Sequence, residues 1–123
     1  MDSITLELPY PPSVNAMWRS INGRNVLSKK GREYRVFALA ILEGLVDPEN
    51  KITRPVCVDM VLHPPTARRY DIDNFTKAVF DALTHSGFWE DDELVHKLTI
   101  SKGEKKTGGI VLLTVTKMEK DNG

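Results

Sequence analysis

The sequence predicts an α/β fold of the α+β type, in which two helices pack against a small mixed sheet of about four strands. Three observations support this fold class. The chain has 123 residues, which suits a single domain spanning residues 1–123. Apolar residues alternate with polar ones in the predicted strands and recur at three- and four-residue spacings in the predicted helices. The elements follow one another in the order β-α-β-α-β-β, and a sheet covered by both helices is the simplest way to bury their apolar faces.

The first part of the chain should hold one strand and one helix. Residues 4–8 alternate as in a half-buried strand, and the prolines that follow end it. Residues 10–27 show no clear periodicity, so we expect an ordered loop with Arg19 and Arg24 near its tip. Ser28 is expected to cap a helix that ends near residue 45. The apolar face of this helix comprises Tyr34, Phe37, Ala38, Ile41, Leu42 and Leu45.

The second part of the chain should hold a helix between strands. Residues 54–63 alternate as in a second strand. The second helix is expected to start near Asp71 or Asp73 and to end at about His85, because a glycine suited to a helix C-terminus follows. The last two strands, expected at residues 94–101 and 110–117, should be joined by a Lys- and Gly-rich hairpin at residues 102–109.

The net charge is zero, but the charges are segregated along the chain. Residues 19–35 hold six bases and one acid, residues 71–93 hold seven acids and one base, and residues 97–106 hold four lysines and one acid. An acidic island between two basic stretches suits a metal-dependent enzyme that acts on a polyanion, with bases on phosphates and acids on a cation. Mixed charges that simply coat a soluble surface explain the same pattern, and charge alone favours that interpretation.

The remaining composition indicates a reducing compartment. Cys57 is the only cysteine and lies in an apolar run, which fits a buried, reduced thiol and excludes a disulfide framework. The sequence has no run of about 18 apolar residues that would predict a membrane span. The amino-terminal segment lacks the apolar region of a secretory signal. We therefore expect a cytoplasmic protein.

Asp71-Ile72-Asp73 is the first chemical signal. Two carboxylates placed two residues apart at a helix start can point at a common cation, and a hard ion such as Mg²⁺ prefers oxygen ligands. A site of this kind would support metal-assisted hydrolysis of a phosphodiester. The same acids can instead cap the helix and complement its dipole, and we expect one of the pair to do so.

Further charged residues extend this signal. Lys77 lies four residues after Asp73 and four before Asp81, so on one helix the three would share a stripe. A lysine beside metal-binding acids can neutralise charge that grows on a phosphate, although an exposed salt bridge is the ordinary alternative. Asp91 and Asp92 occupy a turn that can return towards the sheet edge or can simply be solvated.

Other side chains give weaker signals. Asn74 can bond a carboxylate or a phosphate, or can be a polar residue of the first helical turn. His63 ends a strand and is a conceivable metal ligand, but a lone histidine there is more typical of polar surface. Trp18 can stack on an exposed base or pack against the protein, whereas Trp89 is expected to anchor the acidic turn. The lysines of residues 102–106 can contact phosphate or can keep the chain soluble.

Residues 68–92, RRYDIDNFTKAVFDALTHSGFWEDD, resemble the core motif of the RusA family of Holliday-junction resolvases. That motif is D-x-D-N-x-x-K-x-x-x-D-A-L, then a short turn with Gly and an aromatic residue, then paired Asp. The segment PYPPSVNAMWR at residues 9–19 is similar to the family's Pro-Pro-Ser-x-Asn segment. The length and the order of elements agree with the family over almost the whole chain.

The resemblance implies a homodimer that cuts branched DNA, a four-way junction, by paired symmetric nicks. It also implies a need for Mg²⁺, for which Mn²⁺ can substitute, and a role in DNA recombination and repair in a bacterium or a phage-infected cell. By the same resemblance, Lys77 would be the essential basic residue, and Asp81 would support the structure around the site. The metal-binding acids would be Asp71, Asp73 and Asp92, with Asp91 as a helper. The DNA contacts would be Arg68 and Arg69, and we expect Lys77, Asn74, Arg19 and Arg24 to join them.

Two alternatives remain open on the residues alone. A D-x-D enzyme that binds a nucleotide through a metal would need a diphosphate pocket but neither Asp92 nor the basic loop. A non-catalytic module that binds junctions or other branched DNA would use its acids only for capping and solvation, so replacing Asp71 with Asn would change no activity.

Overall fold

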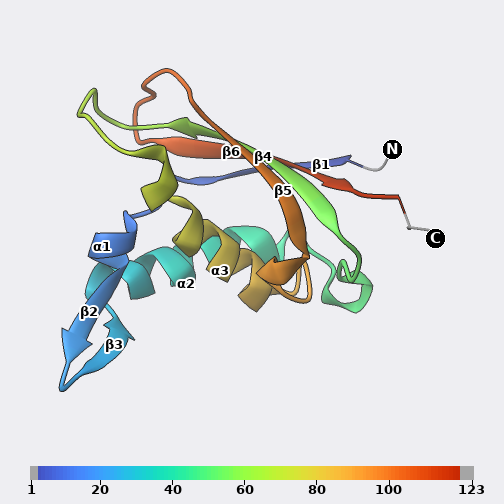
Figure 1. Cartoon of the computed structure of the whole chain (residues 1–123), viewed down its shortest axis with the longest axis horizontal. Helices are drawn as coiled ribbons and strands as arrows, with labels where there is room; N and C mark the ends of the chain where they lie inside the picture. Colours follow the sequence, from blue (N-terminus) through green and yellow to red (C-terminus); the bar gives the residue numbers. More distant parts are fainter. Residues whose placement is uncertain (1–2, 120–123) are drawn as a thin grey trace.

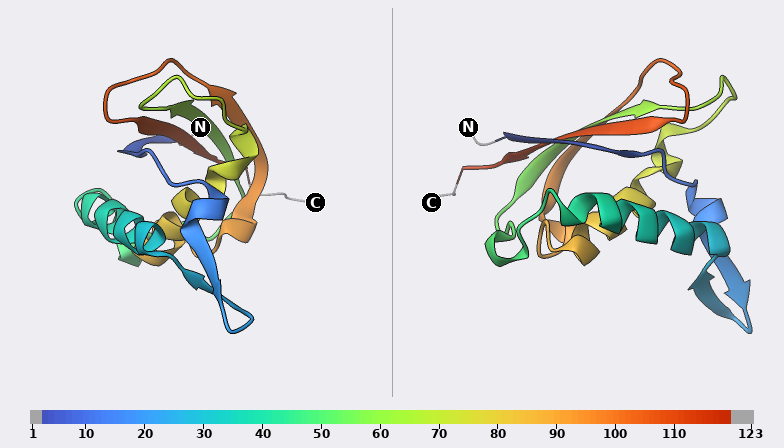
Figure 2. Two further views of the ribbon diagram at one scale, coloured as in Figure 1. Left: turned by 90° about the vertical axis from the view of Figure 1, so that its left-hand side faces the viewer. Right: turned by 180° about the vertical axis from the view of Figure 1, so that it is seen from behind.

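The computed structural model describes residues 3–119. A four-stranded sheet forms one layer, and two long helices cover one of its faces (Figures 1 and 2). The predicted α+β class is confirmed, as is the predicted order of the four long strands and two long helices. The elements are β1 (Ser3–Pro9), α1 (Val14–Met17), β2 (Trp18–Ile21), β3 (Arg24–Leu27), α2 (Lys29–Glu43), η1 (Pro48–Asn50), β4 (Val56–His63), η2 (Ile72–Asn74), α3 (Thr76–Ser86), η3 (Asp92–Leu94), β5 (Val95–Lys102) and β6 (Ile110–Lys117), where η marks a 3₁₀ helix.

The strands of the main sheet lie in the order β1-β6-β4-β5. Strand β6 is antiparallel to both β1 and β4, whereas β5 is parallel to β4, and α3 lies on the crossover that a parallel pair requires. The predicted hairpin at residues 102–109 is therefore wrong, because β4 separates β5 from β6. Glycines and lysines between two strands indicate that the chain reverses, but they do not indicate which strands pair.

The core lies between the sheet and the helices. Strand β4 alternates between buried and more exposed residues, as predicted. Helical spacing in the sequence predicts that the second helix buries Phe75, Ala78, Val79, Ala82 and Leu83; the last four are buried in α3, together with Phe80, whereas Phe75 lies just before the helix. Helix α2 buries a narrower face than predicted: Tyr34, Ala38 and Leu42 are buried, but Phe37 is 58% and Leu45 60% exposed. Leu45 lies beyond the end of the helix at Glu43, so the helical spacing no longer applies to it.

Residues 14–27, predicted as part of a loop, form α1 and a β2–β3 hairpin that projects away from the sheet (Figures 1 and 2). Asn22 and Gly23 sit at the turn with φ values of 51° and 77°. Two central residues with positive φ define a type I′ turn, for which Asn-Gly is the strongest sequence signal. Each strand has only four residues, too few for the alternation of apolar and polar residues to be recognised.

The hairpin is fixed to the body at its base. Ser28 accepts a hydrogen bond from the Gly31 amide at 3.0 Å, and its own hydroxyl donates to the Ala16 carbonyl. The Ser28 amide donates to the Met17 carbonyl at 2.8 Å. A Cβ atom at Gly31 would lie 2.6 Å from that carbonyl oxygen, so only glycine lets α1 approach α2 this closely.

Candidate active site

The first acid pair, Asp71 and Asp73, lies on a 3₁₀ turn and not on a long helix as predicted. Helix α3 begins at Thr76, and Phe75 occupies its N-cap position without a side-chain capping bond. Asp71 precedes η2 and also makes no side-chain capping bond. The expectation that one of the two acids caps the helix is therefore wrong within residues 3–119, and both carboxylates are exposed.

An aromatic cluster positions η2. The ring centroid of Phe75 lies 5.2 Å from that of Tyr10 and 5.6 Å from that of Tyr70. Burial, together with the nearby Tyr70, raises the pKa of Tyr10 to about 12. The cluster thus joins the proline-rich end of β1 to the segment that carries the acid pair, and the two segments are fixed relative to each other.

A hollow of about 510 Å³ contains the first acid pair. Asp71 and Asp73 line it together with Tyr70, Ile72 and Lys102. The ammonium of Lys102 lies 4.6 Å from the centroid of the Tyr70 ring. From the sequence, Lys102 could contact phosphate or simply keep the chain soluble. Its place in this hollow was not predicted, because β5 was expected to pair with β6 in a hairpin.

The second acid pair, Asp91 and Asp92, belongs to the turn that enters β5. The Asp91 carboxylate accepts a hydrogen bond from the Glu93 amide at 3.2 Å and so caps η3. Trp89 is fully buried, its ring centroid lies 5.4 Å from that of Phe80, and its indole N–H donates to the Thr84 hydroxyl at 2.8 Å. The prediction that Trp89 anchors the acidic turn is confirmed.

The two carboxyl groups of this pair interact directly. A hydrogen bond between their side chains lowers the pKa of Asp91 and raises the pKa of Asp92, and partial burial raises the pKa of Asp92 further. The positive charge of Lys77 acts in the opposite direction on Asp92 and lowers the pKa of both groups. The charge of Lys77 therefore acts on the second pair, although Lys77 follows the first pair in sequence.

The predicted stripe of Asp73, Lys77 and Asp81 is wrong. Asp73 lies in η2, outside α3, so the helical spacing does not apply to it. Asp81 forms an ion pair with Arg35, which lies on α2. The Nε atom and one terminal nitrogen of Arg35 lie 2.9 and 2.7 Å from the same carboxylate oxygen of Asp81. The expected structural role of Asp81 fits this ion pair, which joins the two long helices.

The four acids form two pairs in this chain. No three His, Cys, Asp or Glu residues among residues 3–119 lie close enough together to hold a metal ion. The donors of each pair are all carboxylate oxygens, which suits a hard cation such as Mg²⁺. The raised pKa of Asp92 has its main cause in the hydrogen bond with the neighbouring Asp91 carboxyl group, and a bound cation would favour the ionised form of both groups. The residues present therefore fit a divalent cation in their chemistry.

The residues expected to contact DNA lie on three segments of the chain. Arg68 and Arg69 are exposed in the segment that leads from β4 to η2. Arg19 and Arg24 are exposed on the two strands of the projecting hairpin, and Asn74 is half-buried within η2. Whether these side chains contact DNA stays a prediction.

His63 differs from its prediction as polar surface. It is 8% exposed, and its Nδ1 lies 2.8 Å from the carbonyl oxygen of Glu104, to which it donates. The ring also fills the space beside Gly103, where a Cβ atom would lie 2.5 Å from it. His63 thus holds the segment after β5 against the end of β4.

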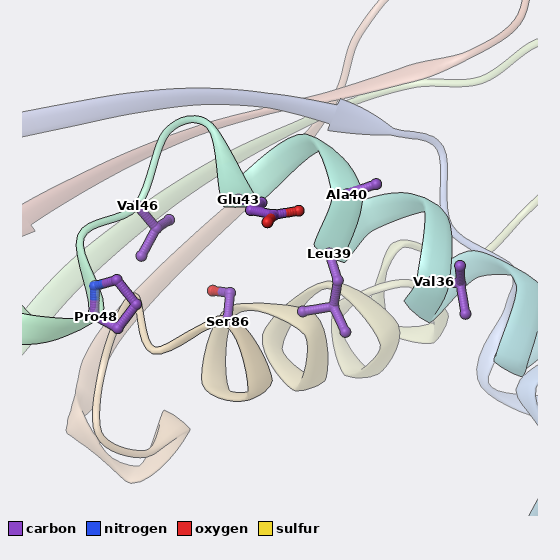
Figure 3. A pocket seen from close by; sticks show the side chains of 7 residues that line it. All are labelled: Val36, Leu39, Ala40, Glu43, Val46, Pro48 and Ser86. Carbon is purple, nitrogen blue, oxygen red and sulfur yellow. The ribbon is translucent and has the colours of Figure 1, made fainter.

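A larger hollow of about 530 Å³ is apolar and lies along the C-terminal half of α2 (Figure 3). Its polar or charged lining residues are only Glu43 and Ser86. The remaining lining residues are Val36, Leu39, Ala40, Val46 and Pro48. This hollow lacks the paired carboxylates and lysines that phosphodiester chemistry requires, so the smaller hollow at Asp71 and Asp73 is the better candidate.

The fold and the site define a small α+β protein with two carboxylate pairs and two lysines, an arrangement suited to chemistry on a phosphodiester. The family model of endodeoxyribonuclease RusA matches residues 9–115. This chain belongs to the RusA endodeoxyribonuclease family.

Curated relatives agree with this assignment over nearly the full length. The crossover junction endodeoxyribonuclease RusA of Escherichia coli (strain K12) is 37% identical over 118 residues, which cover 96% of this chain and 98% of that protein. The protein of the same name from Enterobacteria phage 82 is 38% identical over the same shares of each chain. Within residues 3–119, none of the helices combines the length and the apolar character needed to cross a membrane.

Proposed function

We propose that this chain is a divalent-cation-dependent endonuclease that resolves Holliday junctions by paired symmetric nicks, in DNA recombination and repair. One observation carries the proposal: the chain holds two carboxylate pairs, one in a hollow with Lys102 and one under the charge of Lys77, and its relatives are named crossover junction endodeoxyribonucleases. The domain that performs this function spans residues 1–123.

We assign the residues as follows. Asp71, Asp73 and Asp92 bind Mg²⁺, with Mn²⁺ as a substitute, and Asp91 assists through its bond to Asp92. Because the three ligands form no single cluster among residues 3–119 of one chain, the complete site requires the dimer described below. When bound, the cation supplies Lewis acidity for the scissile phosphate and an activated water. Lys77 places its charge where negative charge grows on the phosphate. Arg68 and Arg69 hold the DNA backbone, joined by Asn74 and by Arg19 and Arg24 on the hairpin, and such contacts favour recognition of shape over sequence.

The active unit is a homodimer, because a twofold-symmetric protein matches a junction cut at two symmetric positions. Strand β5 is a free edge of the sheet in the described residues, eight residues long, and Leu98 on it is 39% exposed. An uncovered edge strand is a ready template for pairing with a second chain. Antiparallel pairing of two β5 strands would bring the end next to Asp92 of one chain towards the end next to Asp71 and Asp73 of the other.

The dimer contact is tested by sedimentation velocity. Leu98→Glu should shift the protein from dimer to monomer at micromolar concentration, because the charge would be buried at the β5 edge. Val36→Glu, in the apolar hollow of α2, is the matched control and should leave the dimer intact (Figure 3). A monomer produced only by the Val36 variant would move the contact to α2.

The proposed activity is tested with a labelled synthetic four-way junction, with and without Mg²⁺. Wild type should make paired symmetric nicks only when the ion is present, and Asp73→Asn should bind the junction without cutting it. Binding by wild type without any cut, in Mg²⁺ or in Mn²⁺, would leave a junction-binding protein. Cleavage that is unchanged in Asp73→Asn would remove this carboxylate from the mechanism.

A further inference from the structure

A third hollow, of about 460 Å³, is lined in part by Lys77. It is formed where the base of the projecting hairpin meets α3, so that segments distant in sequence share its wall. The lining residues are Val14, Asn15, Trp18, Asn25 and Lys77. This hollow is separate from the one at Asp71 and Asp73, and its link to the candidate site is Lys77, whose charge acts on Asp91 and Asp92.

Trp18 is held in place before any ligand binds. It is half-buried, it packs against the core, and it pairs with Leu27 across the hairpin. The residue before it, Met17, is fixed by the hydrogen bond from the Ser28 amide and by the close approach of Gly31. A ring that is already ordered loses little conformational entropy when a ligand stacks on it.

The lining has the chemistry that a nucleobase requires. An aromatic ring offers a stacking surface that any base can use. The exposed amides of Asn15 and Asn25 each carry a donor and an acceptor, which match the hydrogen-bonding edge of a base. The ammonium of Lys77 is suited to the adjoining phosphate. A site for phosphate alone would need neither the ring nor the amides.

We propose that this hollow is a subsite for one unpaired nucleobase of the substrate strand, next to the phosphate that is cut. The subsite rests on the proposed function, since it places the base of the nucleotide whose phosphate faces Lys77. A base within an intact duplex is stacked and paired, and it cannot enter the hollow without an unstacking cost of a few kcal/mol. A base at the crossover point of a junction is freed more easily, so the subsite favours junctions over duplexes.

The test uses junctions that lack a single base, placed at each crossover nucleotide in turn, and measures binding in EDTA so that no cleavage is involved. Wild type should bind the intact junction roughly tenfold more tightly than the junction without the critical base. Trp18→Ala should bind both junctions equally, and Trp18→Phe should keep most of the preference. Thermal melting checks that each variant is folded. If Trp18→Ala does not fold, Asn25→Ala replaces it, and it should reduce discrimination among the four bases at that position severalfold.

The outcomes separate the subsite from the nuclease activity. An equal preference for the intact junction in wild type and in Trp18→Ala, or no preference in wild type at any position, would overturn the subsite. Magnesium-dependent cleavage by wild type in the same experiment series would leave the proposed function standing in that case. If wild type binds with the base preference but cuts nothing in Mg²⁺ or Mn²⁺, the proposed activity fails while the base subsite remains.

Discussion

Asp81 on α3 differs from the acid pair of Asp71 and Asp73, which precedes that helix. Asp81 makes two close contacts with Arg35 and lies 3.6 Å from His85, and its side chain is 18% exposed. Asp71 and Asp73 are exposed and cap no helix. Removing one partner of an ion pair such as Asp81 and Arg35 is costly, whereas Asp71 and Asp73 both line one hollow and expose their oxygens to a cation. The acidic stretch of residues 71–93 thus contains a structural acid and candidate functional acids.

The largest expected difference between the two groups is in cleavage. Asp71→Asn should lower the rate of junction cleavage by about a thousandfold, because cation-assisted stabilisation of the transition state is worth several kcal/mol. Asp81→Asn should change the same rate by no more than a few fold. Single-turnover cleavage of a labelled junction measures both variants. Comparable losses in the two variants would erase the distinction between the groups.

Lys77 extends the comparison from the acids to a basic residue. Lys77→Ala should retain junction binding but lose about a hundredfold or more in cleavage, since removal of one well-placed donor to a developing charge has a cost of this size. Binding is measured by gel shift without divalent ions, and cleavage by single turnover. Lys29→Ala, which changes an exposed lysine at the start of α2 that pairs with Glu33, is the control and should behave as wild type. Normal cleavage by the Lys77 variant would exclude it from the mechanism.

For the free energy of unfolding, we expect the larger loss in the Asp81 variant and not in the Asp71 variant. Asp81→Asn should lower the free energy of unfolding by about 1–2 kcal/mol, because it removes a charged hydrogen-bond partner from the half-buried Arg35. Asp71→Asn should leave the free energy of unfolding unchanged or slightly higher. Urea denaturation without divalent ions compares both with Asp59→Asn, an exposed acid on β4. An equal loss in the Asp71 variant would assign that residue a structural role.

The smallest effect concerns pH. The bond between Asp91 and Asp92 raises the pKa of Asp92, so its contribution to stability is present at low pH and is lost as pH rises through the raised pKa. The lowered pKa of Asp91 contributes in the opposite sense. A cation needs both groups ionised. The increase in melting temperature caused by Mg²⁺ should therefore shrink as pH falls through the pKa of Asp92.

A matched variant makes the pH dependence specific. Asp91→Asn removes the neighbouring carboxyl group, so the pKa of Asp92 should return towards its ordinary value of about 3.9. The loss of the Mg²⁺ effect should then occur at lower pH than in wild type. Thermal melting with and without Mg²⁺, from about pH 4 to pH 8, measures the shift. An identical pH dependence in both proteins would show that the two carboxyl groups are not coupled.

The long elements could be predicted from the sequence because each buries one continuous face. Spacing alone placed β4 within two residues at each end and identified the buried side of α3. The pairing of β5 could not be predicted, because strand order depends on contacts between segments far apart in the chain. The β2–β3 hairpin could have been predicted from Asn22-Gly23, a turn signal that the missing periodicity on either side obscured.

The candidate site was predicted in its residues more than in its arrangement. Residue type and spacing selected both acid pairs and Lys77. The sequence did not indicate that η2 separates Asp73 from α3. It also did not indicate that Lys102 lines the hollow of the first pair, since this depends on how β5 is placed in the sheet. The partner of Asp81 was also hidden, because Arg35 lies 46 residues earlier in the chain.

The position of β6 in the middle of the sheet has a consequence for synthesis of the protein. Within the described residues, β1 pairs only with β6, and their register joins Ser3 to Thr116. During translation β1 therefore remains unpaired until β6 has left the ribosome. Contacts so distant in sequence form slowly, because the chain loses loop entropy before they form. The sheet that supports the acid pairs is thus completed only when β6 becomes available, and a fragment that stops before β6 cannot complete it.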